Sequence, residues 1–150
     1  MLLERVDINP NQADTEYGAT PLSWAAENGH LEVVEMLLER ADIDPNQPDK
    51  SSWTPLLWAI RNGHERVAMM LLEREDINPN QADTKYGATP LSWAAENGHL
   101  GIVKMLLQRK DLNRNKADTQ YNLTPLLRAA RKGHSGVVEM LLEREDINPN

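Results

Sequence analysis

The chain has 150 residues, of which 40% are hydrophobic and 26% charged, with a formal net charge of −7 and no cysteine. This composition is typical of a globular protein and argues against nucleic acid as a partner, because an acidic surface is repelled by phosphate. The lack of cysteine excludes a disulfide framework and a cysteine nucleophile and favours an intracellular, cytoplasmic location. No apolar run approaches the roughly 20 residues that span a bilayer, so we expect no membrane association.

A short pattern recurs four times along the chain. Thr-Pro-Leu begins at Thr20, Thr54, Thr89 and Thr124, and Gly-His begins nine residues after each threonine. The spacings between these threonines are 34, 35 and 35 residues. A fixed period in this range indicates stacked supersecondary units, each too small to bury a core alone. We therefore expect a single domain, 1–150, with a partial unit at 1–12 and four units at about 13–46, 47–80, 81–115 and 116–150.

The local signals of the first full unit predict a helix, a tight turn and a second helix. Thr20 is a favourable N-cap, Pro21 suits the first helical position, and Gly29 provides a left-handed stop. The second helix is expected to start near Leu31 and to present one apolar stripe, made of Leu31, Val34, Leu37 and Leu38. The segment 42–46, with its proline and Asx residues, then favours a turn. Because the later units repeat these signals, we predict an all-α fold without a sheet.

These residues resemble the ankyrin repeat. The family pattern combines Gly-x-Thr-Pro-Leu-His, paired alanines, Gly-His and an apolar second helix, and the first unit matches it at Gly18–Leu22, Ala25–Ala26, Gly29–His30 and Leu37–Leu38. The resemblance covers the whole chain. It implies an ankyrin-repeat solenoid of four stacked helix-turn-helix units, with β-turn finger loops and first helices that line a concave groove. The long return loop also resembles the arrays of fungal NACHT-type sensor proteins.

The sequence departs from the family pattern at one position of every unit. Where the family has a histidine after Thr-Pro-Leu, this chain has Ser23, Leu57, Ser92 and Leu127. One structural hydrogen bond per repeat must therefore be replaced.

The sequence does not indicate catalysis. Every histidine belongs to the repeated Gly-His element, and a residue that recurs with the structural period is better explained by a hydrogen bond that holds a turn. Equivalent histidines cannot share a zinc ion, because neighbouring helices pack about 8–10 Å apart whereas a ligating nitrogen lies about 2 Å from the metal. No phosphate-binding, dinucleotide-binding or zinc-protease motif occurs. We predict no enzyme activity, no catalytic residues, no metal and no cofactor.

Tryptophan recurs at one helical position. Trp24, Trp58 and Trp93 occupy it in successive units, and Arg128 takes it in the fourth. These indoles either pack as an apolar ladder or form a partly exposed strip for a ligand, and Arg128 is expected to stack on the end of either arrangement. Trp53 stands where the other units have Ala19, Ala88 or Leu123, in a finger that the family resemblance places in solvent. We expect an exposed Trp53 that either binds a partner or covers a neighbouring loop.

The residues just before each Gly-His vary from unit to unit. They are Glu27-Asn28, Arg61-Asn62, Glu96-Asn97 and Arg131-Lys132. The resemblance places them on the concave face, where they are either solvated helix ends or positions tuned to a partner. The candidate partner-binding residues are Tyr17, Trp24, Glu27, Trp53, Trp58, Arg61, Tyr86, Trp93, Glu96, Tyr121, Arg128, Arg131 and Lys132. The basic cluster of Arg128, Arg131 and Lys132 predicts that an acidic region of the partner docks on the last unit.

Two stretches of the chain are almost the same. Residues 7–38 and 76–107 are identical at 28 of 32 positions and differ at Glu16/Lys85, Glu32/Gly101, Val33/Ile102 and Glu35/Lys104. Such identity indicates scaffold, because each copy must present the same faces to its neighbours.

The leading interpretation is a non-catalytic module that binds a protein through its finger loops and first helices. One alternative is a designed or excised repeat scaffold with no evolved partner. Another is the ligand-sensing repeat region of a larger signalling protein. End-to-end self-association is also expected, because Met1-Leu2-Leu3 at one end and the apolar last helix at the other look uncapped. That helix keeps Val137, Val138, Leu141 and Leu142.

Overall fold

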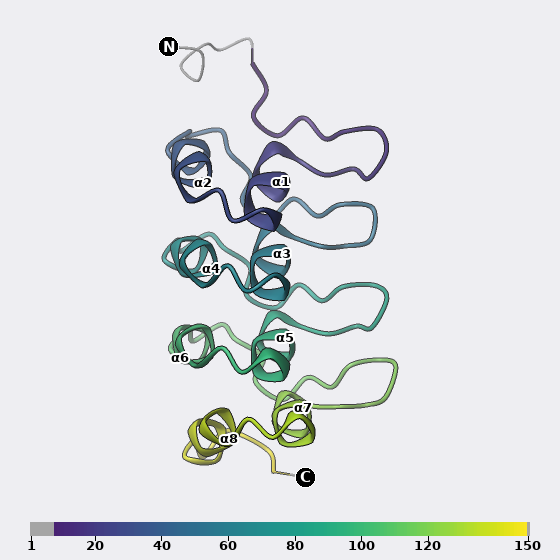
Figure 1. Cartoon of the computed structure of the whole chain (residues 1–150), viewed down its shortest axis with the longest axis vertical. Helices are drawn as coiled ribbons and strands as arrows, with labels where there is room; N and C mark the ends of the chain where they lie inside the picture. The colour runs from purple at the N-terminus through teal and green to yellow at the C-terminus, as the bar shows by residue number, and fades with distance from the viewer. Residues whose placement is uncertain (1–7, 150) are drawn as a thin grey trace. The chain divides into compact units, whose positions relative to one another are not determined.

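The computed structural model describes residues 8–149, and these form eight helices and no strand. The helices are α1 (Pro21–Glu27), α2 (Leu31–Leu38), α3 (Pro55–Arg61), α4 (Glu65–Leu72), α5 (Pro90–Asn97), α6 (Leu100–Leu107), α7 (Pro125–Lys132) and α8 (Ser135–Leu142). The predicted all-α, helix-turn-helix architecture is confirmed. The chain divides into two compact units, Met1–Ile77 and Asn78–Asn150, each with two helix pairs (Figure 1).

The first helix of each pair begins as the sequence predicts. The Thr20 hydroxyl accepts the backbone N–H of Ser23 at 3.2 Å, which satisfies one of the free donors at the start of α1. Thr54, Thr89 and Thr124 cap the other first helices in the same way, and a proline follows each threonine. Gly29 lies in the turn between α1 and α2 and has a φ of 71°, a left-handed conformation that glycine adopts without strain.

The family's missing histidine is replaced in two different ways. The Ser23 hydroxyl shares a buried hydrogen bond of 3.1 Å with the Thr20 hydroxyl, and Ser92 and Thr89 repeat this contact at 3.2 Å. Leu57 is instead fully buried, so apolar packing takes the place of the hydrogen bond. Leu127 is exposed, so its repeat has no buried side chain at this position.

Each unit has its own apolar core between its helix pairs. In unit 1, α1 packs against α3 and α2 against α4, and in unit 2, α5 packs against α7 and α6 against α8. Leu22 and Leu56 are buried in the first helices of unit 1, and Val34 and Leu71 in its second helices. The predicted stripe of α2 is buried at Val34 and Leu37, while Leu31 and Leu38 are only half-buried.

The Gly-His element ties one repeat to the repeat before it. His64 Nε2 lies 2.9 Å from the carbonyl oxygen of Glu27, and His134 Nε2 lies 2.8 Å from that of Glu96. A Cβ on Gly29 would lie 2.4 Å from Nδ1 of His64, so glycine is needed for this close approach as well as for its φ. The expected hydrogen-bonding role of the histidines is confirmed for His64 and His134.

The return loops, such as residues 42–46 after α2, are joined by side-chain hydrogen bonds that the local sequence signals did not predict. Asn11 Nδ2 donates to the carbonyl of Asp42 at 2.7 Å, and the Asn11 side-chain oxygen accepts the backbone N–H of Asp44 at 2.7 Å. Asn80 makes the same two bonds to the next loop of unit 2. A two-bond amide bridge thus joins consecutive return loops within each unit.

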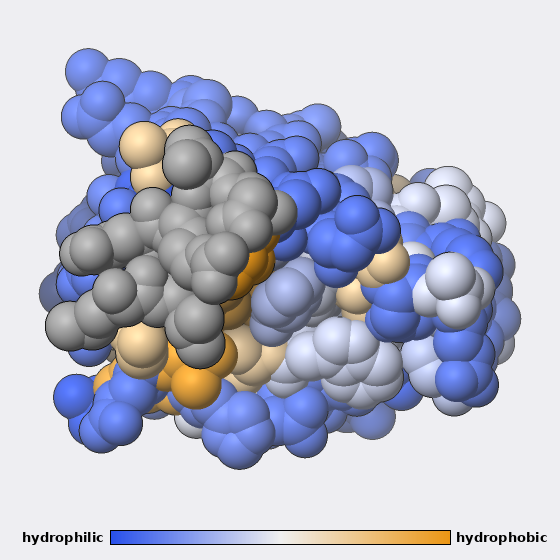
Figure 2. All heavy atoms as spheres, turned by 90° about the horizontal axis from the view of Figure 1, so that it is seen from above, coloured by the Kyte–Doolittle hydropathy of each residue, from blue (hydrophilic) through white to orange (hydrophobic). Residues whose placement is uncertain are grey.

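Several apolar side chains of the second helices remain on the surface. Val33 and Met36 of α2 are exposed, and so is Leu142 of α8 at 56%. The space-filling view in Figure 2 shows apolar residues gathered on one side of a largely hydrophilic surface. The predicted N-terminal apolar remnant, Met1-Leu2-Leu3, lies outside the described residues. Within residues 8–149, no helix is long and apolar enough to cross a membrane.

Candidate functional site

The finger loops are residues 14–19, 49–53, 83–88 and 118–123, each just before a first helix, and an aspartate holds each loop to that helix. In the first finger, the Asp14 carboxylate accepts the backbone N–H of Tyr17 at 2.6 Å and that of Ala19 at 3.2 Å. The same carboxylate accepts the indole N–H of Trp24 at 3.0 Å, which fixes the orientation of that ring. The pKa of Asp14 is lowered, chiefly by the hydrogen bond from the Tyr17 N–H and further by those from the Trp24 indole and two other backbone N–H groups. Desolvation of the carboxylate opposes this shift. The carboxylate therefore stays ionised and keeps the finger and the ring in place.

The aspartate contact recurs in the later repeats. Asp49 Oδ2 accepts the Trp58 indole N–H at 3.0 Å, and Asp83 Oδ2 accepts that of Trp93 at 3.1 Å. In the fourth repeat the equivalent carboxylate, Asp118, binds Arg128 instead. These aspartates were not among the predicted site residues, although each stands five or six residues before Thr-Pro-Leu. That spacing was the available signal.

Two of the fingers add a tyrosine to the tryptophan. The rings of Tyr17 and Trp24 meet edge to face with centroids 5.8 Å apart, and Tyr86 and Trp93 do the same at 5.8 Å. Tyr17 is 53% exposed and Trp24 is 40% exposed, so this aromatic corner is open to solvent in unit 1. Tyr86 and Trp93 are each only half-buried. The indoles are thus partly exposed and individually pinned, which combines features of both expected arrangements.

The expectation that Trp53 is exposed is wrong. Its side chain is 3% exposed and stacks against Trp58, with ring centroids 4.9 Å apart and planes tilted by 36°. The second finger is one residue shorter than the others and has no tyrosine, so the Trp53 ring packs on Trp58 where Tyr17 packs on Trp24. Arg61 then lies over both rings, at 4.9 Å from Trp53 and 5.7 Å from Trp58.

The expectation that Arg128 faces a partner is also wrong. Arg128 is 4% exposed and donates through Nε and Nη2 to the Asp118 carboxylate, at 3.1 and 2.9 Å. Its Nη1 pairs with the Glu96 carboxylate. The guanidinium also lies 5.6 Å from the Trp93 ring, so the expected stacking on the tryptophan series is confirmed. A buried cation needs compensating charge, and the carboxylates of Asp118 and Glu96 supply it. Arg128 is therefore held inside the protein and is not presented to a partner.

The rest of the basic cluster is exposed but partly neutralised. Arg131 Nη2 lies 3.4 Å and Lys132 Nζ 3.8 Å from the Glu96 carboxylate, which is itself mostly buried. Glu96 therefore faces three cations. Burial disfavours the ionised form of Asp118, but the Tyr121 N–H and the Arg128 guanidinium outweigh it and lower the pKa of Asp118.

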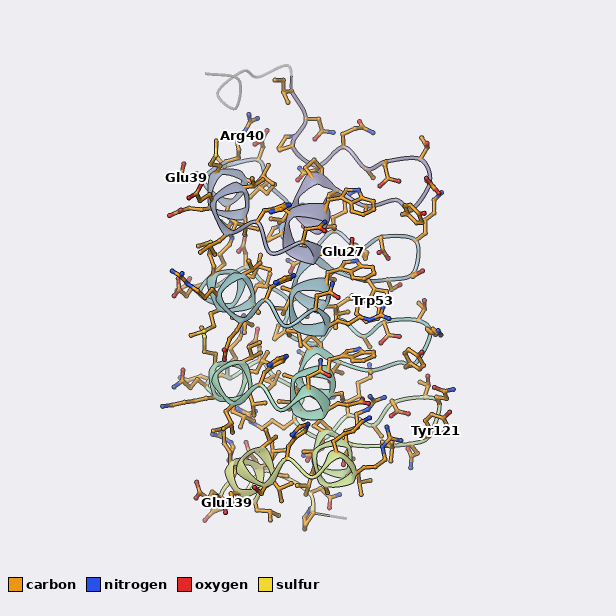
Figure 3. All side chains as sticks on the ribbon, in the orientation of Figure 1. Glu27, Glu39, Arg40, Trp53, Tyr121 and Glu139 are labelled. Carbon is orange, nitrogen blue, oxygen red and sulfur yellow. The ribbon has the colours of Figure 1, made fainter. Side chains whose placement is uncertain are left out.

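The remaining candidate residues lie at the finger tips and helix ends. Tyr121 is 62% exposed at the tip of the last finger loop (Figure 3). Glu27 lies at the end of α1, half-buried, and its carbonyl accepts the side-chain amide of Asn62 at 3.2 Å. Arg61 is exposed at the end of α3. In each unit, the surface made by its finger loops and first helices is called the finger face below.

The described residues do not gather into a metal-binding cluster. Across residues 8–149, no group of three or more His, Cys, Asp or Glu side chains is arranged to hold a metal ion. Nε2 of His64 and Nε2 of His134 each bond to a backbone carbonyl.

Comparison with known proteins identifies one family. The sequence model for ankyrin repeats (3 copies) matches residues 1–83, 43–116 and 75–150. No curated protein matches the chain.

Proposed function

The chain belongs to the ankyrin-repeat family, and we propose that it is a non-catalytic module that binds a protein partner through its finger face. Ankyrin repeats generally serve as protein–protein interaction modules and the family is typically non-catalytic. The proposal narrows this general role to one surface of this chain.

The observation that carries the proposal is the exposure of aromatic side chains on the finger face. Tyr17 and Tyr121 stand at finger tips and Trp24 faces outward from α1, all exposed. Aromatic side chains contribute a large share of the binding energy at protein interfaces, because they bury a large area at little entropic cost. Trp24 is also held in one orientation by Asp14, which lowers the entropy lost on binding.

Charged residues on the finger face of unit 2 favour selectivity for the partner. Arg131 and Lys132 remain exposed on unit 2, so an acidic segment of a partner is expected there. We expect the attraction between this segment and unit 2 to be weaker than for a free basic cluster, because Arg128 is buried and Glu96 neutralises part of the charge.

A peptide-display selection against the immobilised full chain tests the proposal. The selected peptides should lose at least about fivefold in affinity for a Tyr17→Ser variant, the effect of about 1 kcal/mol at an interface. Peptides that contact unit 2 should bind less tightly to an Arg131→Glu, Lys132→Glu variant, most clearly at low salt. Melting of each variant by circular dichroism checks that it remains folded.

The matched control is Met36→Ser, which removes a similarly exposed side chain from α2, away from the finger loops. Peptides that bind the finger face should keep their affinity for this variant. A selection that yields no specific peptide would support the alternative of a scaffold without a partner. Peptides that depend on Met36 and not on Tyr17 would place binding on the second helices and contradict the proposal.

The narrower alternative, a ligand-sensing repeat region of a larger signalling protein, uses the same face. Binding of a selected peptide to this chain is expected under both interpretations. Isolation of the parent gene product, and inspection of its neighbouring domains, would distinguish them.

Self-association remains part of the proposal. Of the apolar residues predicted to be uncapped on the last helix, Val137 and Leu141 are buried, but Leu142 is exposed, and so is Leu127 of α7. Exposed apolar surface favours association. Light scattering over a concentration series should show an increasing mean mass, and a Leu127→Glu, Leu142→Glu variant should stay monomeric. A wild-type chain that remains monomeric at the highest concentration would contradict this expectation.

A further inference from the structure

Unit 2 holds a guanidinium in a site built from its own residues. Arg128 of α7 lies over the Trp93 ring at 5.6 Å and pairs with the carboxylate of Glu96, both of which belong to α5. A planar guanidinium suits this setting, because it stacks on an aromatic face while its N–H groups bind a carboxylate. On α5, the residues that contact the guanidinium are thus one tryptophan and one glutamate.

Unit 1 repeats the same receiving residues. Trp24 and Glu27 of α1 correspond to Trp93 and Glu96, in the stretch where the two copies are nearly identical. The corner geometry agrees too, since Tyr17 meets Trp24 at a centroid distance of 5.8 Å. The register of the following repeat is also the same, because His64 bonds to the Glu27 carbonyl just as His134 bonds to that of Glu96.

Among the described residues of unit 1, no guanidinium occupies the equivalent place. The residue at the position of Arg128 is Trp58, and its indole N–H donates to Asp49 at 3.0 Å. Arg61, the nearest cation along α3, lies over Trp53 and Trp58 instead. Among the described residues, no hydrogen bond or ion pair engages the carboxylate of Glu27.

The charge around the unit 1 corner also favours a cation. Asp14 and Glu16 belong to its finger, and Glu27 stands three residues after Trp24 on α1. In unit 2 the position of Glu16 is taken by Lys85, whose ammonium lies 5.0 Å from the Tyr86 ring. Lys50 adds one positive charge near the first finger, where it donates to the backbone carbonyls of Thr15 and Glu16. The two fingers thus differ in charge where their backbones are alike.

We propose that the corner formed by Tyr17, Trp24 and Glu27 binds an arginine side chain of a partner protein, which stacks on Trp24 and pairs with Glu27 as Arg128 does with Trp93 and Glu96 in unit 2. This inference rests on the proposed protein-binding function and specifies the chemistry of one contact. Arginine is the expected residue rather than lysine, because a compact ammonium cannot both stack on the indole and present a flat edge to Glu27.

Titration of the ¹⁵N-labelled full chain with N-acetyl-arginine N-methylamide tests the inference by NMR. The indole N–H resonance of Trp24 should shift and saturate with a dissociation constant of about 1–10 mM, as expected for one exposed cation–π contact and one ion pair. The Trp93 resonance should move much less, since Arg128 already covers that ring. The blocked citrulline analogue, which has a similar shape and no charge, should produce no saturable shift.

Two variants separate the site from non-specific attraction to an acidic protein. Glu27→Gln should weaken the binding of the arginine probe, whereas Glu32→Gln, an exposed acid on α2, should leave it unchanged. Trp58→Arg should fill the site from inside the protein and abolish the Trp24 response. Circular dichroism of each variant checks that the fold is retained. If Trp58→Arg does not fold, the comparison of Glu27→Gln with Glu32→Gln decides the question.

Equal shifts at Trp24 and Trp93, equal responses to arginine and citrulline, or no response at Trp24 would each overturn the inference. These outcomes leave the proposed function separately testable. Displayed peptides that require Tyr17 but contain no arginine would uphold protein binding and reject the arginine contact. The absence of any selected peptide would reject both.

Discussion

The corners around Trp24 in unit 1 and Trp93 in unit 2 share a sequence and a backbone geometry, yet they present different chemistry. In unit 2 a single residue of the next repeat, Arg128, joins Trp93 to two carboxylates and is buried. In unit 1 the same position holds Trp58, which bonds only to its own finger aspartate through the indole. One side chain thus decides whether the corner is closed from within or open to a ligand.

The difference teaches that copies of a repeat need not be functionally equivalent even when they are nearly identical. The residues that set the local fold are the same in both copies, and the residue that covers the corner comes from the neighbouring repeat. A comparison of isolated repeats would therefore miss it.

The largest effect is expected from Arg128→Met, which removes the cation from the closed corner. The variant leaves Asp118 buried without its guanidinium, and breaking a buried pair in this way costs about 3–5 kcal/mol. Urea unfolding followed by circular dichroism measures the loss. Arg131→Met is the control, because that side chain is exposed and its removal should change stability by no more than about 0.5 kcal/mol. Similar stabilities for the two variants would show that the closed corner contributes little.

The Gly-His ties should respond alike in both units. His64→Ala and His134→Ala each remove a side chain that bonds to a carbonyl of the preceding repeat, so each should cost about 1–3 kcal/mol in stability. Thermal unfolding measures both. His30, which is exposed, provides the control. A clear difference between the two variants would mean that the repeats are coupled unequally despite their matching contacts.

The tryptophan indoles provide a finer comparison. Trp24→Phe removes the N–H donor to Asp14 and keeps most of the ring, so it should cost about 0.5–1.5 kcal/mol. Trp93→Phe should cost more, because it also weakens the contact with the Arg128 guanidinium. The order of the two melting temperatures tests the comparison, and an equal decrease would show that the guanidinium gains nothing from the indole.

Acid should weaken unit 2 through Asp118. Its pKa is lowered from the ordinary value of 3.8, so the unfolded chain binds a proton more readily than the folded one. The stabilisation by the ionised carboxylate is therefore present above about pH 4 and is lost as the pH falls through the lower, folded-state pKa. Stability measured between about pH 2 and 6 should fall less steeply for Asp118→Asn than for the wild type. Parallel curves would show that other carboxylates govern the acid response.

The smallest effect on stability is expected from Glu16→Lys, which gives the first finger the residue of the third. Both positions are exposed, so stability should change by no more than about 0.5 kcal/mol. The affinity of the arginine probe for the Trp24 corner should fall by about two- to threefold, because a surface charge acts weakly through water. An unchanged affinity would limit the recognition to Glu27 and the rings.

Local signals in the sequence predict most of the fold. Thr20, Pro21 and Gly29 act within a few residues of themselves, through a cap, a fixed φ and a left-handed stop, so their effects do not depend on the rest of the chain. The fourfold recurrence of these signals also reveals the repeat, and with it the hydrogen-bonding role of His64 and His134. The exposed aromatic residues Tyr17 and Tyr121 follow from their finger positions in the same way.

The burial of Trp53 and Arg128 was decided only by the tertiary structure. Trp53 is covered because a finger shortened by one residue brings its ring onto Trp58 and beneath Arg61. Arg128 is buried because a carboxylate from its own finger and another from α5, the first helix of the preceding repeat, converge on it. Burial of a large or charged side chain depends on partners that are distant in sequence, and a local pattern does not show whether those partners arrive.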